Sequence, residues 1–240
     1  MSTNPDAEVL HRLRVALRRL RALFWAYRPL LDLQVEENQR ALFKQLADAA
    51  GGTRDWDIAI ELHGRTAPNA FTPTARLMNA RKQALETSRR SLSHEDASAA
   101  LQNAVADANR AINATGDSTL LTKFASKRLA SAQRALHGQM RAAARAKRRA
   151  YALHEVRKSG KKVRCLLEFF GPMLTKRELK PLKSLGEIHR RFGALNDIVT
   201  SEALLSAHPE IFPDADVHQA TLRALKKERK RRMRSAAKLL

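Results

Sequence analysis

An internal repeat constrains the fold of this chain more than any other feature of its sequence. The segment HRLRVALRRLR at 11–21 returns as HEVRKSGKKVR at 154–164. Further along, GGTRD at 51–55 returns as GALND at 193–197. Matching segments in the same order predict two related halves, an N-terminal helical bundle (1–146) and a C-terminal one (147–240), arranged about a pseudo-twofold axis.

Composition and periodicity predict helices throughout. The 240 residues contain only 9 glycines and 8 prolines, and good helix formers dominate. We therefore predict an all-α fold. The expected helices cover 7–27, 35–50, 54–62, 74–92, 95–114, 119–146, 150–170, 176–192, 195–207 and the stretch from 216 to the end.

Each copy of the repeat places a ladder of cations beside a hydrophobic stripe. At 100° per residue, His11, Arg14, Arg18 and Arg21 fall within an arc of about 80°. Leu10, Leu17 and Phe24 occupy the neighbouring arc, which is typical of a helix face that packs in a core. A charged face that only keeps a helix soluble usually points away from the core. The ladder therefore indicates either a ligand site or a solvated helix face.

The formal net charge of +21 predicts an anionic partner, because such a field attracts anions and contact releases counterions. Nucleic acid, an acidic membrane surface and phosphate compounds all fit this charge. The single cysteine, Cys165, excludes a disulfide within the chain and lies in an apolar run that indicates a buried thiol. The N-terminus does not resemble a signal peptide and no apolar run is long enough to span a membrane, so we expect a cytoplasmic protein without a membrane partner.

Pseudo-twofold packing predicts that the two ladders share one basic cavity. Two facing ladders would present positive charge at every helical turn over about 15 Å. A single phosphate needs only a few donors, whereas a ladder of this length suits a polyanion whose charges recur along a line.

The doubled pattern HxxRxxx[RK]xx[RK], followed by GxxRD in one half and GxxND in the other, resembles the CHAD domain family (conserved histidine α-helical domain) from about residue 6 to the end. The resemblance implies a single CHAD domain made of two four-helix bundles, with a basic central channel that binds inorganic polyphosphate. Family members occur alone or fused to triphosphate-hydrolysing domains, and some accompany polyphosphate granules. Since no such partner domain is visible in this sequence, we expect a stand-alone member, with polyphosphate granules as a further location.

The resemblance implies a set of polyphosphate-binding residues at the ladder positions and on the helices that follow them. These are His11, Arg14, Arg18, Arg21, Lys44, Arg54, His154, Arg157, Lys161, Arg164 and Arg190. Asn196 replaces Arg54 in the second copy, a departure that puts the ligand role of this position in question. Asp55 and Asp197 are better suited to capping helices or orienting cations.

Catalytic motifs are weak, and we expect a binding protein that needs no cofactor. The sequence contains no P-loop and no paired acidic motif at metal-binding spacing. A site made of cations stabilises a bound anion as much as it stabilises a transition state. Two alternatives stay open: a basic protein associated with nucleic acid, and a metal-dependent phosphohydrolase that uses His11 and His154.

Overall fold

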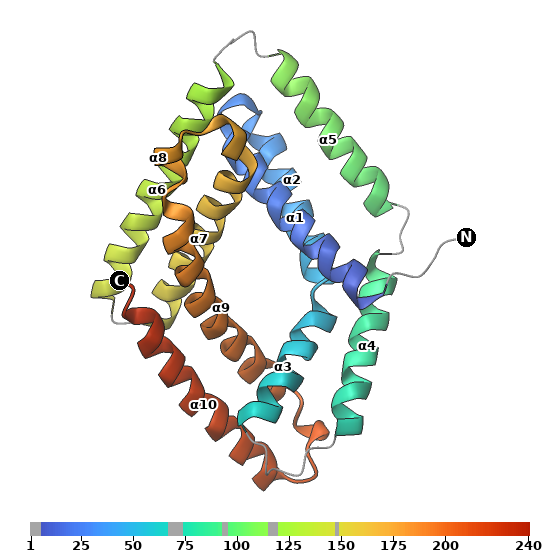
Figure 1. Cartoon of the computed structure of the whole chain (residues 1–240). Helices are drawn as coiled ribbons and strands as arrows, with labels where there is room; N and C mark the ends of the chain where they lie inside the picture. Colours follow the sequence, from blue (N-terminus) through green and yellow to red (C-terminus); the bar gives the residue numbers. More distant parts are fainter. Residues whose placement is uncertain (1–5, 67–73, 93–95, 115–119, 147–148) are drawn as a thin grey trace. The chain divides into compact units, whose positions relative to one another are not determined.

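The computed structural model describes residues 6–66, 74–92, 96–114, 120–146 and 149–240, and every regular element in these ranges is a helix (Figure 1). The all-α prediction is confirmed. The expected boundary between the halves, at 147, lies outside the described residues. The α-helices are α1 (Ala7–Tyr27), α2 (Leu33–Ala49), α3 (Gly52–Thr66), α4 (Thr74–Leu92), α5 (Asp96–Ala114), α6 (Leu121–Arg145), α7 (Arg149–Phe170), α8 (Lys176–Leu179), α9 (Pro181–Ser206) and α10 (Ala215–Ala237). Short 3-10 turns lie at Arg28–Leu30, Gly171–Met173 and Pro209–Ile211.

Side-chain caps explain where several helices begin. Asp6 accepts a hydrogen bond from the backbone N–H of Val9 at the start of α1, where the sequence predicts that the first helix begins. Asp32 and Asp214 cap α2 and α10 in the same way. Each cap satisfies a backbone donor that has no partner within the helix.

The expected break at Gly193 is wrong, because α9 runs unbroken from Pro181 to Ser206. Its apolar stripe continues through the glycine, and Phe192, Leu195 and Ile198 on either side of it are buried. Continuous burial of one face stabilises the helix by more than the roughly 1 kcal/mol that glycine costs relative to alanine. Asp197 consequently lies inside α9 and does not cap a helix.

The chain forms two compact units, and the first comprises Met1–Arg54 and Asn79–Thr119. Its core joins α1, α2 and α5 around Leu17, Phe24 and Phe43. The rings of Phe24 and Phe43 meet edge to face, with centroids 5.0 Å apart. The apolar stripe predicted for α1 is the face that packs in this core.

The second unit comprises Asp55–Met78 and Leu120–Leu240. Here α7 packs against both α6 and α9, and α9 packs against α10. Leu153, Val156 and Val163 form the buried stripe of α7. Gly160 stands where the first copy of the repeat has leucine, and a Cβ there would lie 3.3 Å from Cγ2 of Ile188. Glycine thus allows α7 and α9 to approach closely.

Candidate functional site

The cations of the α1 ladder lie beside the core of the first unit and are half-buried. Arg12 and Arg19, on the same helix but outside the ladder, are exposed. The α1 ladder is thus less solvated than Arg12 and Arg19, and partly desolvated cations interact more strongly with an anion. The half-buried residues are His11, Arg14, Arg18 and Arg21.

Arg14 binds the turn that follows α2. Its Nη1 donates a hydrogen bond of 2.8 Å to the carbonyl oxygen of Gly51. A cation at this position also suits the negative end of the α2 dipole. One nitrogen of this predicted phosphate ligand therefore has a structural role, which sequence reasoning did not anticipate.

The last residue of the ladder, Arg21, lies among the charged side chains of α2. Burial lowers the pKa of Arg21, the nearby Arg40 lowers it further, and Asp48 opposes the change. Nε of Arg21 is buried and has no hydrogen-bond partner among the described residues, as is also true of Nδ1 of His11. The cationic face of α1 is thus directed along α2.

The two other residues predicted in this unit are exposed. Lys44 on α2 pairs with Asp48, with Nζ 3.0 Å from Oδ2. Arg54 lies in the first turn of α3. Exposure makes both side chains accessible to an anion. An anion that binds Lys44 must displace the carboxylate of Asp48.

In the second unit, the α7 ladder is directed along α9. Arg157 and Lys161 are half-buried, whereas His154 and Arg164 are exposed. Nε of Arg164 lies 2.6 Å from Oε1 of Glu168, so this end of the ladder is partly neutralised.

His189 on α9 is a residue of this site that sequence reasoning missed. Its pKa is lowered to about 4, first by burial and then by Arg164, Lys161 and Arg157, while Glu168 opposes the change. Its Nε2 is buried and has no hydrogen-bond partner in the described part of the chain. A neutral imidazole therefore lies beside three cations of the ladder.

Asn196 lies two helical turns beyond His189 and connects α9 to the other end of the ladder. The pKa of His154 is lowered, first by partial desolvation of the imidazole and then by Arg157 and Lys158. Glu155 and a hydrogen bond with Asn196 oppose the change. Asn196, which departs from the repeat, thus lies close enough to the ladder histidine to affect its pKa. His189 and Asn196 are seven residues apart, a spacing that could have revealed their shared face.

Two glycines of α9 leave open space near His189 and Asn196. Gly193 lies between His189 and Asn196 on one helix face. A Cβ at Gly193 or at Gly186 would meet no protein atom within 4 Å. The α7–α9 surface thus combines cations, a neutral histidine and unfilled space, which together can accommodate phosphate oxygens.

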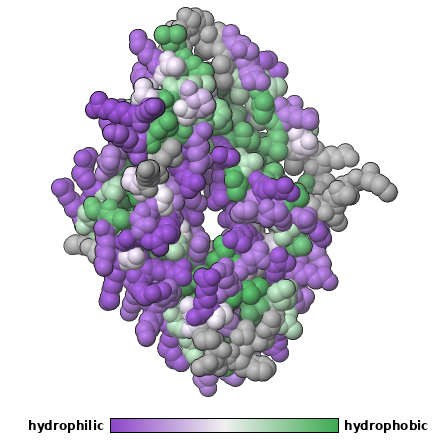
Figure 2. All heavy atoms as spheres, viewed as in Figure 1, coloured by the Kyte–Doolittle hydropathy of each residue, from purple (hydrophilic) through white to green (hydrophobic). Residues whose placement is uncertain are grey.

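Arg190 belongs to a different surface from its neighbour His189. It is exposed, its guanidinium pairs with Glu187, and it lines a pocket between α9 and α10. Figure 2 shows hydrophilic residues over most of the visible face of the molecule. Among the described residues, no three histidine, cysteine or acidic side chains come together as they would around a metal ion.

Comparisons with known proteins agree with this architecture. The family model "CHAD domain" matches residues 2–206. A crystal structure of the CHAD domain from the plant Ricinus communis is similar, with a TM-score of 0.77 and 20% sequence identity over 98% of this chain and 81% of that one. No curated protein matches. In the described part of the chain, no helix is long and apolar enough to cross a bilayer.

Proposed function

The chain belongs to the CHAD domain family, and we propose that it binds inorganic polyphosphate through the cationic surfaces of α1–α2 and α7–α9 without hydrolysing it. The observation that carries this proposal is the surface around His189. There, three cations of α7 lie close enough to a half-buried imidazole to lower its pKa. A surface of this kind binds an anion that approaches along the helix.

The spacing of the ladder favours a linear polyanion. The residues of the ladder recur at every turn of α7 from His154 to Arg164, over about 15 Å at 1.5 Å per residue. Arginine can bind phosphate oxygens with two donors at once, and lysine adds a point charge. Polyphosphate presents negative charge at a regular spacing along a flexible chain, so successive phosphates can contact successive residues of the ladder.

The proposal includes no catalytic step. Cations that line a polyanion stabilise its ground state and its transition state to a similar degree, and equal stabilisation does not accelerate the chemistry. We place the activity in the cytoplasm, with polyphosphate granules as one site of action. Release of phosphate on incubation with polyphosphate and Mg²⁺ or Mn²⁺ would contradict the non-catalytic part of the proposal.

Binding to long-chain polyphosphate, duplex DNA and RNA at matched, near-physiological salt tests the choice of partner. We expect polyphosphate to bind more tightly than either nucleic acid. Equal or tighter binding of nucleic acid would overturn the proposal and favour a basic protein associated with nucleic acid.

Paired variants on a single helix test the site. Replacing Arg18 and Arg21 with alanine removes two half-buried ladder cations, whereas replacing Arg12 and Arg19 removes two exposed cations outside the ladder. Both variants lose the same charge. We expect roughly a tenfold or greater loss of polyphosphate affinity only for the ladder variant, because desolvated charge-assisted contacts are the stronger ones. Equal losses would show that the net charge acts without a defined site.

A further inference from the structure

A charged motif of the form ExxRR occurs on both α9 and α10. Glu187 precedes Arg190 and Arg191 on α9, and Glu228 precedes Arg231 and Arg232 on α10. Each glutamate accepts hydrogen bonds from both arginines of its own helix, at distances between 2.5 and 2.8 Å. Both carboxylates have pKa values lowered to about 2, chiefly by these hydrogen bonds, so they stay ionised near neutral pH.

The two motifs bind each other's helix reciprocally. Nη1 of Arg191 donates to the carbonyl oxygen of Ser235 over 2.9 Å, and Nη1 of Arg232 donates to that of Ala194 over 2.8 Å. Ser235 lies three residues after Arg232, and Ala194 lies three residues after Arg191. The contact is therefore locally two-fold symmetric, and it holds four guanidinium groups in defined orientations.

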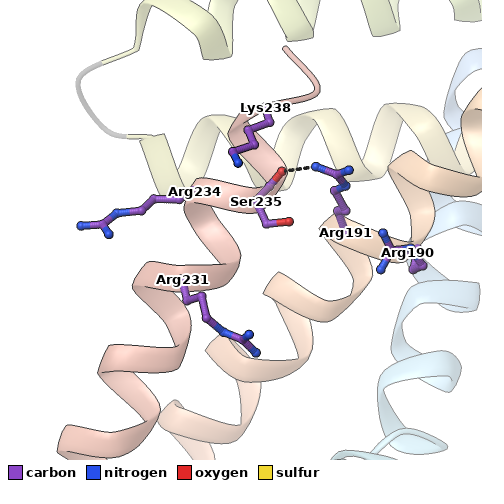
Figure 3. Close-up of a pocket in the computed structure, with 6 residues that line it drawn as sticks. All are labelled: Arg190, Arg191, Arg231, Arg234, Ser235 and Lys238. Carbon is purple, nitrogen blue, oxygen red and sulfur yellow. Dashed lines mark hydrogen bonds between the residues drawn. The ribbon is translucent and has the colours of Figure 1, made fainter.

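A pocket of about 510 Å³ opens at this contact (Figure 3). Its lining residues are Arg190, Arg191, Arg231, Arg234, Ser235 and Lys238. An adjoining cavity of about 300 Å³ shares most of these residues and adds Arg232. Figure 3 shows the side chain of Arg231 extending toward α9, whereas that of Arg234 extends away from it.

Positive charge at the pocket exceeds the negative charge that the motifs supply. Six cationic residues line the two cavities, and Glu187 and Glu228 offset two of them. The glutamates occupy Nε and Nη2 of Arg190 and Arg231. Nη1 of each outer arginine donates no hydrogen bond to the described residues, so each retains a positioned donor.

We propose that the α9–α10 pocket is a second phosphate-binding site, separate from the ladders, for a ligand that carries at least two phosphate groups. Arg190 and Arg231 each direct Nη1 as a donor to a phosphate group of their own, and Lys238 adds a positive charge at the rim of the pocket. The end of a polyphosphate chain and a compact, multiply phosphorylated small molecule share this chemistry. The pocket volume is in the range of small-molecule sites, but its lining is cationic, which selects for phosphates over apolar ligands.

Calorimetric titration of the intact protein with tripolyphosphate and with inositol hexakisphosphate tests the proposal. We compare the Arg190→Ala, Arg231→Ala double variant with an Arg223→Ala, Lys227→Ala control. The control removes the same charge from exposed positions of α10 that do not line the pocket. We expect the pocket variant to lose roughly tenfold or more affinity relative to the control for at least one of the two ligands.

The two ligands distinguish the sources of the phosphate. A loss confined to tripolyphosphate identifies the end of a chain, and a loss confined to inositol hexakisphosphate identifies a compact molecule. Equal affinities in the pocket variant and the control, for both ligands, would overturn the proposal. Circular dichroism checks that both variants are folded, and an Arg190→Lys, Arg231→Lys variant separates lost charge from lost fork geometry.

Ladder variants keep this test separate from the function proposed above. An Arg157→Ala, Lys161→Ala variant should bind tripolyphosphate at the α9–α10 pocket with unchanged affinity. Loss of that binding in the ladder variant alone would assign the ligand to the ladder and overturn the second site.

Discussion

Arg14 and Gly51 are joined by a hydrogen bond and by a steric limit. Nη1 of Arg14 donates to the carbonyl oxygen of Gly51, and a Cβ at Gly51 would lie 2.5 Å from that same nitrogen. The glycine backbone φ is not positive. Close approach of the guanidinium, rather than an unusual backbone conformation, is thus the reason for glycine at this position.

Gly51→Ala should lower the free energy of unfolding by about 1 kcal/mol, because it displaces a charge-assisted hydrogen bond. In an Arg14→Ala background the same change should be neutral or slightly stabilising, since alanine restricts the unfolded chain. Urea unfolding of the four proteins in this double-mutant cycle measures the coupling. Additive effects would contradict the proposed contact.

Gly138→Ala is the matched control for Gly51→Ala and should have the opposite sign. Gly138 lies inside α6, and a Cβ there would meet no atom within 4 Å. Alanine should therefore raise the free energy of unfolding by about 0.5–1 kcal/mol, the helix preference of alanine over glycine. Urea unfolding under the same conditions as for Gly51→Ala measures this change, and a destabilisation would contradict the expectation.

Arg40→Ala should destabilise the first unit far more than Lys44→Ala. The Glu36 carboxylate is fully buried, and Nη1 of Arg40 lies 2.9 Å from its Oε1. Removing Arg40 leaves a buried carboxylate without this cation, which costs about 3 kcal/mol in comparable cases. Lys44 and Asp48 form the matched control, because they are also four residues apart on α2 but both are mostly exposed. Exposed pairs of this kind contribute roughly 0.3–0.5 kcal/mol. Similar midpoints of thermal unfolding in the two variants would contradict the argument.

Polyphosphate binding should take up a proton at His189 in mildly acidic solution. In the free protein its pKa is about 4, because burial and the cations of α7 disfavour the imidazolium. A polyanion that neutralises those cations removes part of this penalty, so the pKa rises toward its ordinary value of about 6.5. Affinity should increase as the pH falls below about 6.5. Calorimetry at about pH 5.5, in two buffers of different ionisation enthalpy, measures the proton uptake. The uptake should decrease in His189→Gln and persist in His137→Gln, and a pH-independent affinity would contradict the prediction.

His189 also affects the stability of the free protein, with a definite sign. Its pKa in the folded state is below that of the unfolded chain, so the unfolded state binds more protons between about pH 4 and 6.5. The contribution is complete above about pH 6.5 and is lost as the pH falls toward 4. Urea unfolding of wild type and His189→Gln across this range should show a steeper acid loss for wild type.

Filling the open space on α9 should block the ladder without unfolding the helix. Gly193 lies between His189 and Asn196, and a Cβ there would meet no atom within 4 Å. The side chain of Gly193→Leu should therefore occupy space on the α7–α9 surface that the proposed function assigns to polyphosphate. Leucine also favours helix, so α9 should be retained. We expect polyphosphate affinity to fall in Gly193→Leu and to be unchanged in Gly138→Leu, in which the same side chain is added to α6. Unchanged affinity in both would place the anion elsewhere.

Much of the fold follows from sequence because helical periodicity is a local signal. The boundaries expected for α1, α4 and α5 agree with the structure to within a residue, and the stripe through Leu10, Leu17 and Phe24 is the buried face of α1. The prediction fails at Gly193, where burial of one face outweighs a helix breaker. Gly51 has the same place in the repeat but lies just after the end of α2, where Arg14 binds its carbonyl oxygen. Sequence spacing alone does not contain that contact.

The sequence alone determined that the chain is helical, that it is strongly basic, and that two ladders of cations lie beside apolar stripes. Those features depend on residue type and on a period of 3.6, which act within one helix. Tertiary structure decided which side chains meet across helices. Packing of α7 on α9 brings His189 and Asn196 to the ladder, and packing of α9 on α10 brings two ExxRR motifs together. The pKa of His189 and the charge of the α9–α10 pocket arise from those contacts, because burial and Coulomb forces act through space rather than along the chain.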